Sequence, residues 1–381
     1  MENVKGFRDI EDCSKRKIIK NIIENTFRLY NFQQVETPII EYEEFVKANN
    51  QNDEAISDIF KLKDKGDRNL ALRYEFTFQL KRLGVNKKLP YRRYQIGPVF
   101  RDEPVTANRW RQFTQCDVDI LGSTTQDEAE ILKISSEILN QLKIKFTINI
   151  NNRKLLNEIL EEQGVKDNNK QAVIKEIDKL DKLSEAEIKQ NLKKYKAEKI
   201  LEIIKKPESF FKKYQAYKEI EQLKKACENY KIKVNFQPSL ARGLSYYNSS
   251  VFEIKSDIKE TIAGGGSYLI NNTQSTGISF GLERLELLSK LTPEYKKILI
   301  ISLSQDKKAI QLSEKIRKQG ISCSVFFSKP SKAMEYANAY NIPIVIFLGS
   351  EEVKAKKLKI KYMNTGKEKL ISEKEIEKEL G

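Results

Sequence analysis

Residues 100–113 read FRDEPVTANRWRQF, a charged stretch between two runs of β-type residues. The flanking runs, residues 91–100 and 113–121, are rich in aromatic and β-branched side chains, which favour strands. A third short run of this kind lies at residues 71–74. Because the runs are short and joined by charged or turn-rich connections, we predict an antiparallel sheet across residues 69–122.

The chain on either side of this sheet has helical character. Apolar side chains recur at helical spacing from Ile18 to Tyr30, which predicts a helix that ends near Asn31, before an extended segment at residues 33–40. Residues 155–230 are dense in Lys, Glu, Leu and Ile at helical spacing. This second pattern predicts a helical insertion.

Strand-like sequence returns after the predicted insertion. β-Type residues at 251–254 precede a helical stretch at 282–290, so we expect the sheet domain to be interrupted and then resumed. After Pro293, strand-like and helical segments alternate, which is typical of a small α/β domain with parallel strands. We place the sheet domain at residues 1–145 and 235–291, the insertion at 146–234 and the C-terminal domain at 294–381.

The charge of the chain points to a polyanionic partner. Lys and Arg number 69 against 54 Asp and Glu, which gives a formal net charge of +15. Clustered cations gain binding free energy by releasing counterions from a polyanion, and nucleic acid is the leading candidate. A single run such as residues 354–359 is better explained as the solvated face of a lysine-rich chain.

Several kinds of chemistry are excluded by residue usage. The chain contains no histidine, so it has no imidazole base, Ser–His or Cys–His nucleophile system or histidine metal ligand. Its four cysteines lack a CxxC spacing, which argues against a zinc site or a disulfide framework. No apolar run approaches the length that a bilayer needs, and residues 1–15 are charged, so we expect a cytoplasmic protein without a membrane partner.

Three motifs occur in one order along the chain. Residues 100–103 with 109–113 resemble motif 2 of the class II aminoacyl-tRNA synthetases, residues 279–284 resemble motif 3, and residues 35–39 resemble motif 1. Two further stretches, ARGLSYY at 241–247 and QCDVD at 115–119, are similar to segments of the histidyl-tRNA synthetases. The resemblance covers everything except much of the predicted insertion.

The resemblance implies both fold and activity. The fold is an α+β class II catalytic domain, an antiparallel sheet flanked by helices, with a helical insertion and a C-terminal α/β anticodon-binding domain. The activity is ATP-dependent activation of histidine and its transfer to tRNA(His), with Mg²⁺ bridging the outer phosphates. Motif 1 implies a homodimer built across the first helix and residues 35–40.

The family resemblance also assigns the residues that handle ATP. Arg101 is expected to contact the α-phosphate and the substrate carboxylate, Arg284 the γ-phosphate, and Arg242 the α-phosphate side, where planar guanidinium forks suit phosphate oxygens. These three are the predicted catalytic residues. Glu103 is placed to accept from the adenine amino group and Phe113 to stack on adenine, while Arg109 completes the ATP site.

A second group is assigned to histidine. Asp119 and a tyrosine are expected to bind the imidazole, and Gln115 shares the strand face of Asp119 at a spacing of two. Because neighbours on a strand face opposite ways, we expect either Tyr246 or Tyr247 to be a core aromatic. The complete set expected at the histidine site is Glu75, Thr77, Gln115, Asp119, Arg242, Tyr246, Tyr247 and Tyr268.

The motif 2 loop is assigned to the tRNA acceptor end, through Thr106, Arg109 and Arg111. In the family a Gln in this loop helps to recognise an extra guanylate, and Thr106 takes its place here. Other departures are Ser245, where the family has Asp, and Ser267 and Leu269, where it has Arg and Asp. A charged pair lost together would explain them.

Non-catalytic relatives are the alternative reading. A histidine-sensing regulatory subunit or a tRNA-binding regulator would share the catalytic fold. Such paralogues typically lose the arginines or the anticodon domain. This chain keeps all three arginines, Arg101, Arg242 and Arg284, and residues 294–381 supply the C-terminal domain. The enzyme is therefore the favoured interpretation.

Overall fold

The computed structural model describes residues 2–47, 54–242, 246–258, 260–293, 297–373, 375–376 and 379. Ser245 lies outside these residues. The chain divides into two compact units, Met1–Leu291 and Thr292–Gly381. None of the helices in the described ranges is long and apolar enough to cross a membrane.

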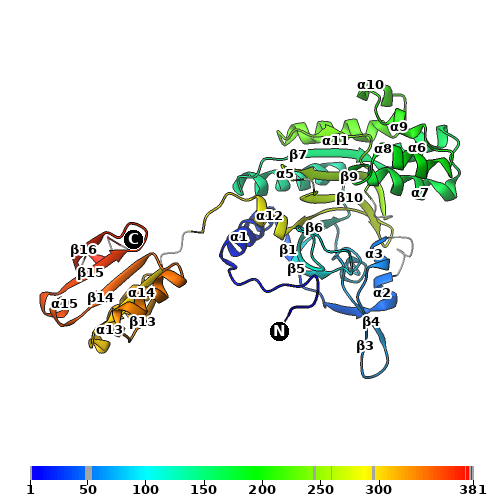
Figure 1. The fold of residues 1–381 in the computed structure, drawn as a ribbon. Helices are drawn as coiled ribbons and strands as arrows, with labels where there is room; N and C mark the ends of the chain where they lie inside the picture. Colours follow the sequence, from blue (N-terminus) through cyan, green and yellow to red (C-terminus); the bar gives the residue numbers. More distant parts are fainter. Residues whose placement is uncertain are drawn as a thin grey trace. The chain divides into compact units, whose positions relative to one another are not determined.

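An eight-stranded sheet forms the centre of the first unit, in the order β1-β5-β6-β11-β10-β9-β7-β8 (Figure 1). The two edge pairs, β1 with β5 and β7 with β8, are parallel, and the other pairs are antiparallel. Its strands are β1 Gln33–Gln34, β5 Tyr91–Phe100, β6 Gln112–Leu121, β7 Thr147–Asn152, β8 Asn235–Phe236, β9 Tyr247–Lys255, β10 Ala263–Ile270 and β11 Thr273–Gly281. The predicted hairpin of β5 and β6 is confirmed.

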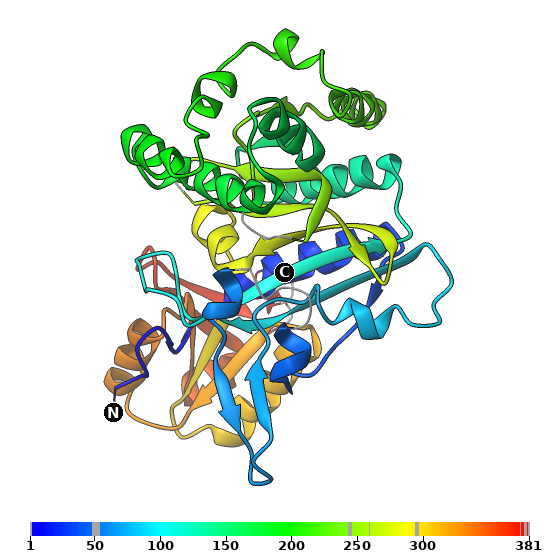
Figure 2. The same ribbon diagram turned by 90° about the vertical axis from the view of Figure 1, so that its right-hand side faces the viewer.

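A second, three-stranded sheet has the order β2-β4-β3, and its β3–β4 hairpin projects from the first unit (Figure 2). Its strands are β2 Ile40–Tyr42, β3 Lys61–Lys63 and β4 Asn69–Leu72. The extended segment predicted at residues 33–40 is not one strand, because β1 ends at Gln34 and β2 begins at Ile40. Pro38 lies in this gap and has no N–H to donate to a ladder.

Helices cover the large sheet and make up the predicted insertion. They are α1 Ser14–Leu29, α2 Glu43–Lys47, α3 Glu54–Ser57, α4 Leu80–Leu83, α5 Thr125–Gln141, α6 Arg153–Glu162, α7 Asp167–Asp178, the 3₁₀ turn Lys179–Asp181, α8 Glu185–Lys193, α9 Ile200–Ile203, α10 Glu208–Phe211, α11 Tyr217–Asn229 and α12 Leu282–Leu288. Local sequence explains their starts. Asp127 accepts from the N–H of Thr124 at 2.8 Å before α5, and Asn152 accepts from the N–H of Lys154 at 2.8 Å before α6.

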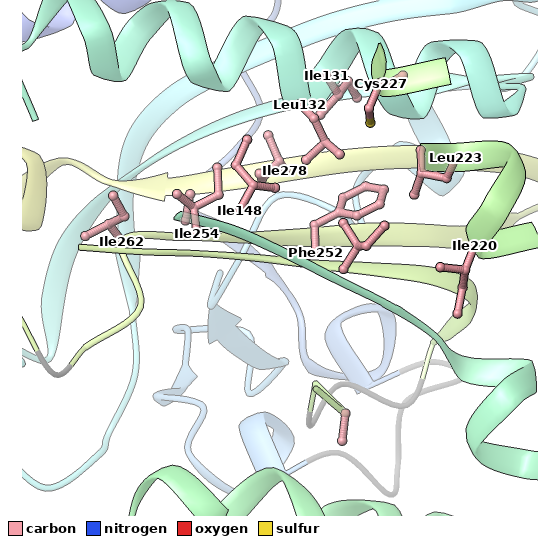
Figure 3. Close-up of a cluster of buried hydrophobic side chains, with 14 of the residues drawn as sticks. Ile131, Leu132, Ile148, Ile220, Leu223, Cys227, Phe252, Ile254, Ile262 and Ile278 are labelled. Carbon is pink, nitrogen blue, oxygen red and sulfur yellow. The ribbon is translucent and has the colours of Figure 1, made fainter. Parts of the chain in front are cut away.

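The core of the first unit lies between helices and sheet. Side chains of α5 and α11, including Leu132 and Leu223, point toward side chains of the sheet strands such as Phe252 and Ile278 (Figure 3). The cluster continues into α6 and α7 through Leu155 and other buried residues. The helices after β7 therefore share one core with the sheet, and β7 itself is a strand of that sheet.

The second unit is a five-stranded sheet in the order β13-β12-β14-β15-β16. Its elements are β12 Lys297–Ser302, α13 Asp306–Lys318, β13 Ser322–Phe326, α14 Pro330–Ala339, β14 Ile344–Leu348, α15 Ser350–Ala355, β15 Lys357–Tyr362 and β16 Glu368–Ser372. The first three strands are parallel, as predicted. The lysine run at residues 354–359 is largely exposed, as predicted, and its second half belongs to β15, which pairs antiparallel with β14 and β16.

Candidate active site

A cavity of about 230 Å³ opens on one face of the large sheet. Four side chains of β6 enter it from alternate positions, because alternate residues of a strand share a face. They are Phe113, Gln115, Asp117 and Asp119. Side chains of β10, β11 and α12 complete the walls, and the connection between β5 and β6 closes one end.

Nearly all of the predicted site residues meet in this cavity. Those that line it are Glu75, Thr77, Arg101, Glu103, Arg109, Phe113, Gln115, Asp119, Arg242, Tyr246, Tyr247, Tyr268 and Arg284. They come from segments up to two hundred residues apart in the sequence. The fold therefore assembles one polar site from residues that the motifs placed separately.

Arginines give one end of the cavity a positive potential. Arg101 donates from Nε to the carbonyl of Tyr74 at 3.1 Å, and its guanidinium lies 5.2 Å from the ring centre of Phe113. Arg284 donates from Nη1 to the carbonyl of Thr261 at 2.5 Å. Burial lowers the pKa of Arg284, and repulsion from Arg109 lowers it further. Such mutual repulsion among cations is relieved when an anion binds between them.

Arg242 has an unusual backbone, with φ at 54°. Its side chain lies against Gly264 of β10, where an added Cβ would come within 2.6 Å of Nη1. Burial acts to lower the pKa of Arg242, but the nearby Tyr247, Asp178 and Glu253 outweigh it, so the pKa is raised. The nearest carboxylate, Glu253, lies 3.8 Å from Nη1. The guanidinium is thus kept charged and free to engage an anion.

Glu103 lies at the arginine-lined end and is buried. Its Oε2 forms an ion pair with Arg109, and its Oε1 lies 3.8 Å from Arg101 Nη1. The two arginines therefore hold the carboxylate of Glu103 near the ring of Phe113. Its Oε1, which is 3.8 Å from Arg101, stays available as an acceptor.

The other end of the cavity is acidic and aromatic. Asp119 accepts from the hydroxyl of Tyr268 and pairs with the fully buried Arg93 at 2.8 Å. Burial raises the pKa of Asp119, although Arg93 and Tyr268 oppose the rise. This end offers a carboxylate and a tyrosine side by side, as expected for binding a flat N–H donor.

Asp117 was not among the predicted site residues. It lies between Gln115 and Asp119 on the same face of β6, and burial together with the charge of Asp119 raises its pKa to about 8. Within the described residues, Asp117 Oδ1 and Gln115 Oε1 have no hydrogen-bond partner. The spacing of two that singled out its neighbours applies equally to Asp117 and could have found it.

The two adjacent tyrosines both line the cavity. The expectation that one of them is a core aromatic is confirmed for Tyr247, which belongs to a buried hydrophobic cluster. Tyr246 nevertheless lines the same cavity, because it stands just before β9 begins, where strand alternation does not apply. Their ring centres are 4.8 Å apart, and Tyr246 donates to Glu75 at 3.2 Å. The hydroxyl of Tyr246 thus links the segment at 241–247 to Glu75, and the family resemblance assigned both to histidine binding.

Comparison with known proteins agrees with this geometry. A family model described as histidyl-tRNA synthetase matches residues 6–285, and one described as an anticodon-binding domain matches residues 297–381. The chain belongs to the histidyl-tRNA synthetase family. It is 33% identical to histidine–tRNA ligase 2 of Shouchella clausii over 97% of this chain and 98% of that protein, and 32% identical to the histidine–tRNA ligase of Pyrococcus horikoshii over 99% and 97%.

Solved structures give the same fold. The crystal structure of histidyl-tRNA synthetase from Nostoc sp. PCC 7120 superposes with a TM-score of 0.83, at 23% identity, over 100% of this chain and 98% of that chain. The predicted fold class and the predicted membership of the aminoacyl-tRNA synthetases are thereby confirmed. Full-length similarity to ligases also favours the enzyme over the non-catalytic alternative.

Two residues assigned to the tRNA acceptor do not line the cavity. Thr106 forms a backbone bridge with Arg109 at the tip of the β5–β6 connection. Arg111 pairs with Asp102 at 2.9 Å, and its N–H donates to the carbonyl of Gly6 at 2.9 Å. Both residues therefore belong to the outer loop of the hairpin.

Glu283 and Trp110 also line the cavity and were not predicted as site residues. Glu283 accepts from the N–H of Thr114 at 3.0 Å and from Arg16 at 2.5 Å. It thereby ties the start of α12, and with it Arg284, to β6 and α1. Its position inside the motif 3 segment was the available signal.

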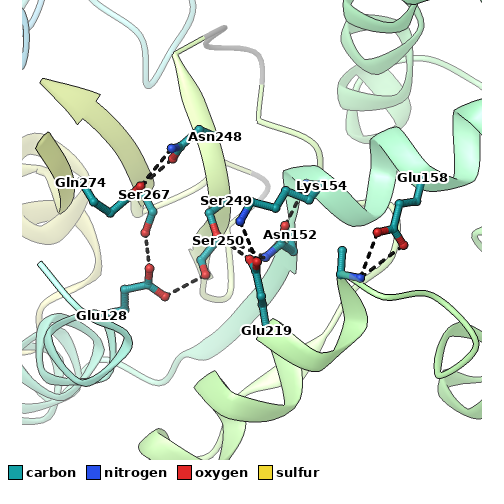
Figure 4. Close-up of polar contacts among 11 residues, drawn as sticks. Glu128, Asn152, Lys154, Glu158, Glu219, Asn248, Ser249, Ser250, Ser267 and Gln274 are labelled. Atoms are coloured by element: carbon teal, nitrogen blue, oxygen red, sulfur yellow. Dashed lines mark hydrogen bonds and ion pairs between the residues drawn. The ribbon is translucent and has the colours of Figure 1, made fainter. Parts of the chain in front are cut away.

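Ser267 is one of the positions that depart from the family pattern. It belongs to β10 and does not line the cavity. Its hydroxyl donates to Glu128, which also accepts from Ser250 at 2.7 Å (Figure 4). Burial raises the pKa of Glu128, and the two serine hydroxyls oppose the rise. The position is therefore part of a buried hydrogen-bonded group.

Proposed function

We propose that the chain is a histidine–tRNA ligase that uses ATP to form histidyl-adenylate and then transfers histidine to the 3′ end of tRNA(His). The observation that carries the proposal is one cavity that is lined by four arginines and by a paired aspartate and tyrosine. An anionic triphosphate suits the first end and an imidazole N–H suits the second.

In the first step, a carboxylate oxygen of histidine attacks the α-phosphorus of ATP. A bond forms between that oxygen and phosphorus as the bond to the bridging oxygen of the β-phosphate breaks, and pyrophosphate leaves. No protein group needs to supply or remove a proton, because the nucleophile is already an anion. The protein contributes position and neutralising charge, which explains how a chain without histidine can catalyse the reaction.

The arginines divide this work. Arg101 and Arg242 would contact the α-phosphate, where charge changes during the displacement, and Arg284 the departing γ-phosphate. A guanidinium offers paired donors to phosphate oxygens without reorganising. Glu103 would accept from the adenine amino group while adenine stacks on Phe113, and Arg109 would hold Glu103 in place.

Histidine would bind at the acidic end. Glu75, Thr77 and Gln115 are proposed for the α-ammonium group, and Asp119 with Tyr268 for the imidazole. A substrate with an apolar side chain would offer no N–H to the buried carboxylate of Asp119, which would then keep only Arg93 and Tyr268 as partners. Amino acid selection is therefore proposed to depend on Asp119.

Mg²⁺ would be held mainly by the phosphates. Among the described residues, no group of three or more Asp, Glu or Cys side chains is arranged to hold a metal. Two of the carboxylates that line the cavity, Glu103 and Glu283, are engaged by arginines. This fits an ion that retains water and phosphate ligands, and its chemistry is to neutralise charge on the leaving pyrophosphate.

In the second step, a terminal ribose hydroxyl of the tRNA attacks the carbonyl carbon of the adenylate. An ester bond forms, AMP departs and the hydroxyl proton is released. The outer loop with Thr106, Arg109 and Arg111 is proposed to approach the acceptor end, and residues 294–381 to bind the anticodon. A tRNA substrate also places the enzyme in the cytoplasm.

We further propose a homodimer across α1 and the segment that leads into β2. Large apolar side chains are exposed there, with 84% of Leu29 and 50% of both Ile40 and Tyr42 accessible. Exposed apolar side chains of this size favour burial against a second surface.

Exchange of labelled pyrophosphate into ATP tests the proposed function. The purified protein is assayed with each of the twenty amino acids in turn, with Mg²⁺ present. Exchange that depends on histidine and on no other amino acid is the expected result. A protein that binds histidine but supports no exchange would be a non-catalytic paralogue, and the proposal would then be wrong.

A further inference from the structure

The segment that leads to Arg242 is attached to the start of the predicted insertion. Residues 238–242 have no regular secondary structure, so their backbone carbonyls need partners from elsewhere. Two side chains at the junction between β7 and α6 supply them. These are Asn151, the second-to-last residue of β7, and Arg153, the first residue of α6.

Arg153 binds the backbone of the predicted catalytic arginine itself. Its Nη1 donates to the carbonyl of Ala241 at 2.7 Å and to that of Arg242 at 3.1 Å. Its Nη2 donates to Gln171 of α7 at 2.5 Å, and only 4% of the residue is exposed. A buried guanidinium whose donors are directed in this way allows the bound carbonyls little freedom.

Asn151 binds the same segment at Pro238 and Leu240, which precede the two residues bound by Arg153. Its Nδ2 donates to the carbonyls of Pro238 at 3.0 Å and Leu240 at 2.8 Å, and the side chain is 1% exposed. Together with Arg153 it therefore holds four carbonyls within five consecutive residues. Both donors come from a rigid strand end and helix start rather than from another loop.

The backbone at Arg242 needs such support. Its φ of 54° is a left-handed conformation that residues other than glycine adopt only when the surroundings impose it. From this conformation the guanidinium reaches the cavity across Gly264. If the carbonyls of Ala241 and Arg242 were released, the backbone could relax and the guanidinium would leave its place.

We propose that Asn151 and Arg153 are positioning residues for Arg242, which makes the start of the insertion a part of the catalytic machinery. The inference rests on the proposed function, because it assumes that Arg242 acts on the α-phosphate of ATP. Neither side chain lines the cavity. They act only through the backbone that they hold.

Asn152, between the two, provides a matched control. Its side chain donates to Glu219 of α11 at 2.8 Å and caps α6 (Figure 4). It is fully buried, like its neighbours, but it holds the insertion helices instead of residues 238–242. Loss of Asn152 should therefore reduce stability without affecting Arg242.

The first measurement is the turnover of pyrophosphate exchange at saturating histidine and ATP. We expect Arg153→Ala and Asn151→Asp to lower it on the order of 10–100-fold, since a small displacement of a catalytic group has effects of this size. Arg153→Lys should recover part of the loss, because an ammonium can still donate to a carbonyl. Asn152→Ala should stay within about twofold of the parent while its unfolding temperature falls.

The second measurement separates positioning from general damage. The Kd of ATP is determined by calorimetry with saturating histidinol, which lacks the attacking carboxylate, for single variants and for their combinations with Arg242→Ala. Arg153→Ala should weaken ATP binding when Arg242 is present and have no further effect when it is absent. The same should hold for Asn151→Asp, which keeps the size of the side chain.

Equal losses of ATP affinity in both backgrounds would overturn the inference, and so would normal turnover in folded Arg153→Ala. A parent protein that shows no exchange at all would instead refute the proposed function. The two failures are therefore distinguishable.

Discussion

Arg242 combines the features that a histidine-free active site requires of a single residue. It is charged at every physiological pH, it is held in an imposed backbone conformation, and its nearest carboxylate is 3.8 Å away. Such a group acts by being in place before the reaction begins. Preorganised charge of this kind is commonly the largest contribution to enzymatic rate acceleration.

Replacing Arg242 should therefore affect the chemical step more than the fold. We predict that Arg242→Ala lowers the turnover of pyrophosphate exchange by roughly 10²-fold or more, the usual effect of losing one preorganised donor. Arg242→Lys should also be severely impaired, because an ammonium lacks the planar fork. Exchange assays paired with circular dichroism test this, and near-normal turnover in both folded variants would contradict the role.

Asp117 should make stability depend on pH. Its pKa rises from 3.8 to about 8 on folding, so the folded chain binds the extra proton between these values. The free energy of unfolding should then fall as pH rises through this window. Asp117→Asn removes the contribution, so the variant should lose less stability than the parent from pH 5 to pH 8. Urea titrations at several pH values measure the difference, and parallel curves would refute the assignment.

The charged residues that the motifs singled out for phosphate and imidazole chemistry line one cavity. Asp117 was missed although it lies in the QCDVD segment, because the family resemblance assigned no role to that position. The imposed backbone of Arg242 and its carbonyl contacts with Arg153 could not be foreseen, since they join residues 89 positions apart. Only the fold brings them together.

At the scale of elements, the β5–β6 hairpin carries both the residues proposed to bind ATP and the outer loop. Strand alternation turns Phe113 and Gln115 inward, while the loop with Thr106 and Arg111 stays outside the cavity. Its arginines are already paired with Asp102 and Glu103.

This arrangement predicts weak reading of the extra guanylate of tRNA(His). Thr106 offers one hydroxyl where the family has a Gln, so base discrimination of up to about 1–3 kcal/mol should be lost there. Charging of transcripts with and without that nucleotide should differ by less than about tenfold. A loss of several orders of magnitude on its removal would show that Thr106 or another residue still reads it.

The first helix and the β5 strand were predicted closely, because both carry clear sequence patterns. The predictions were less accurate for two segments whose local sequence does not show their strand pairing. The segment at residues 33–40 was predicted to be extended, but it pairs with other strands only at its two ends. The strand β15 was not predicted because its sequence is rich in lysine, and its burial comes from its neighbours β14 and β16. Pairing across a sheet is not visible in the strand alone.

At the scale of the molecule, the first unit leaves apolar side chains exposed along α1 and β2. If this region is the dimer interface, Ile40→Lys should shift the protein toward monomer, because a charge would be buried without a partner. Sedimentation at micromolar concentration measures the change. Leu183→Lys, at an exposed apolar position in the insertion, is the control and should leave the assembly intact. A parent protein that sediments only as monomer would contradict the dimer.

The central claim is that one cavity of arginines, aspartates and tyrosines activates histidine for tRNA without any histidine in the protein. The most direct test is ATP-dependent attachment of labelled histidine to a tRNA(His) transcript by the purified chain. The account predicts charging that needs ATP and Mg²⁺ and that falls at least tenfold in Arg242→Ala. If the parent protein binds histidine and the tRNA but attaches none, the account is contradicted.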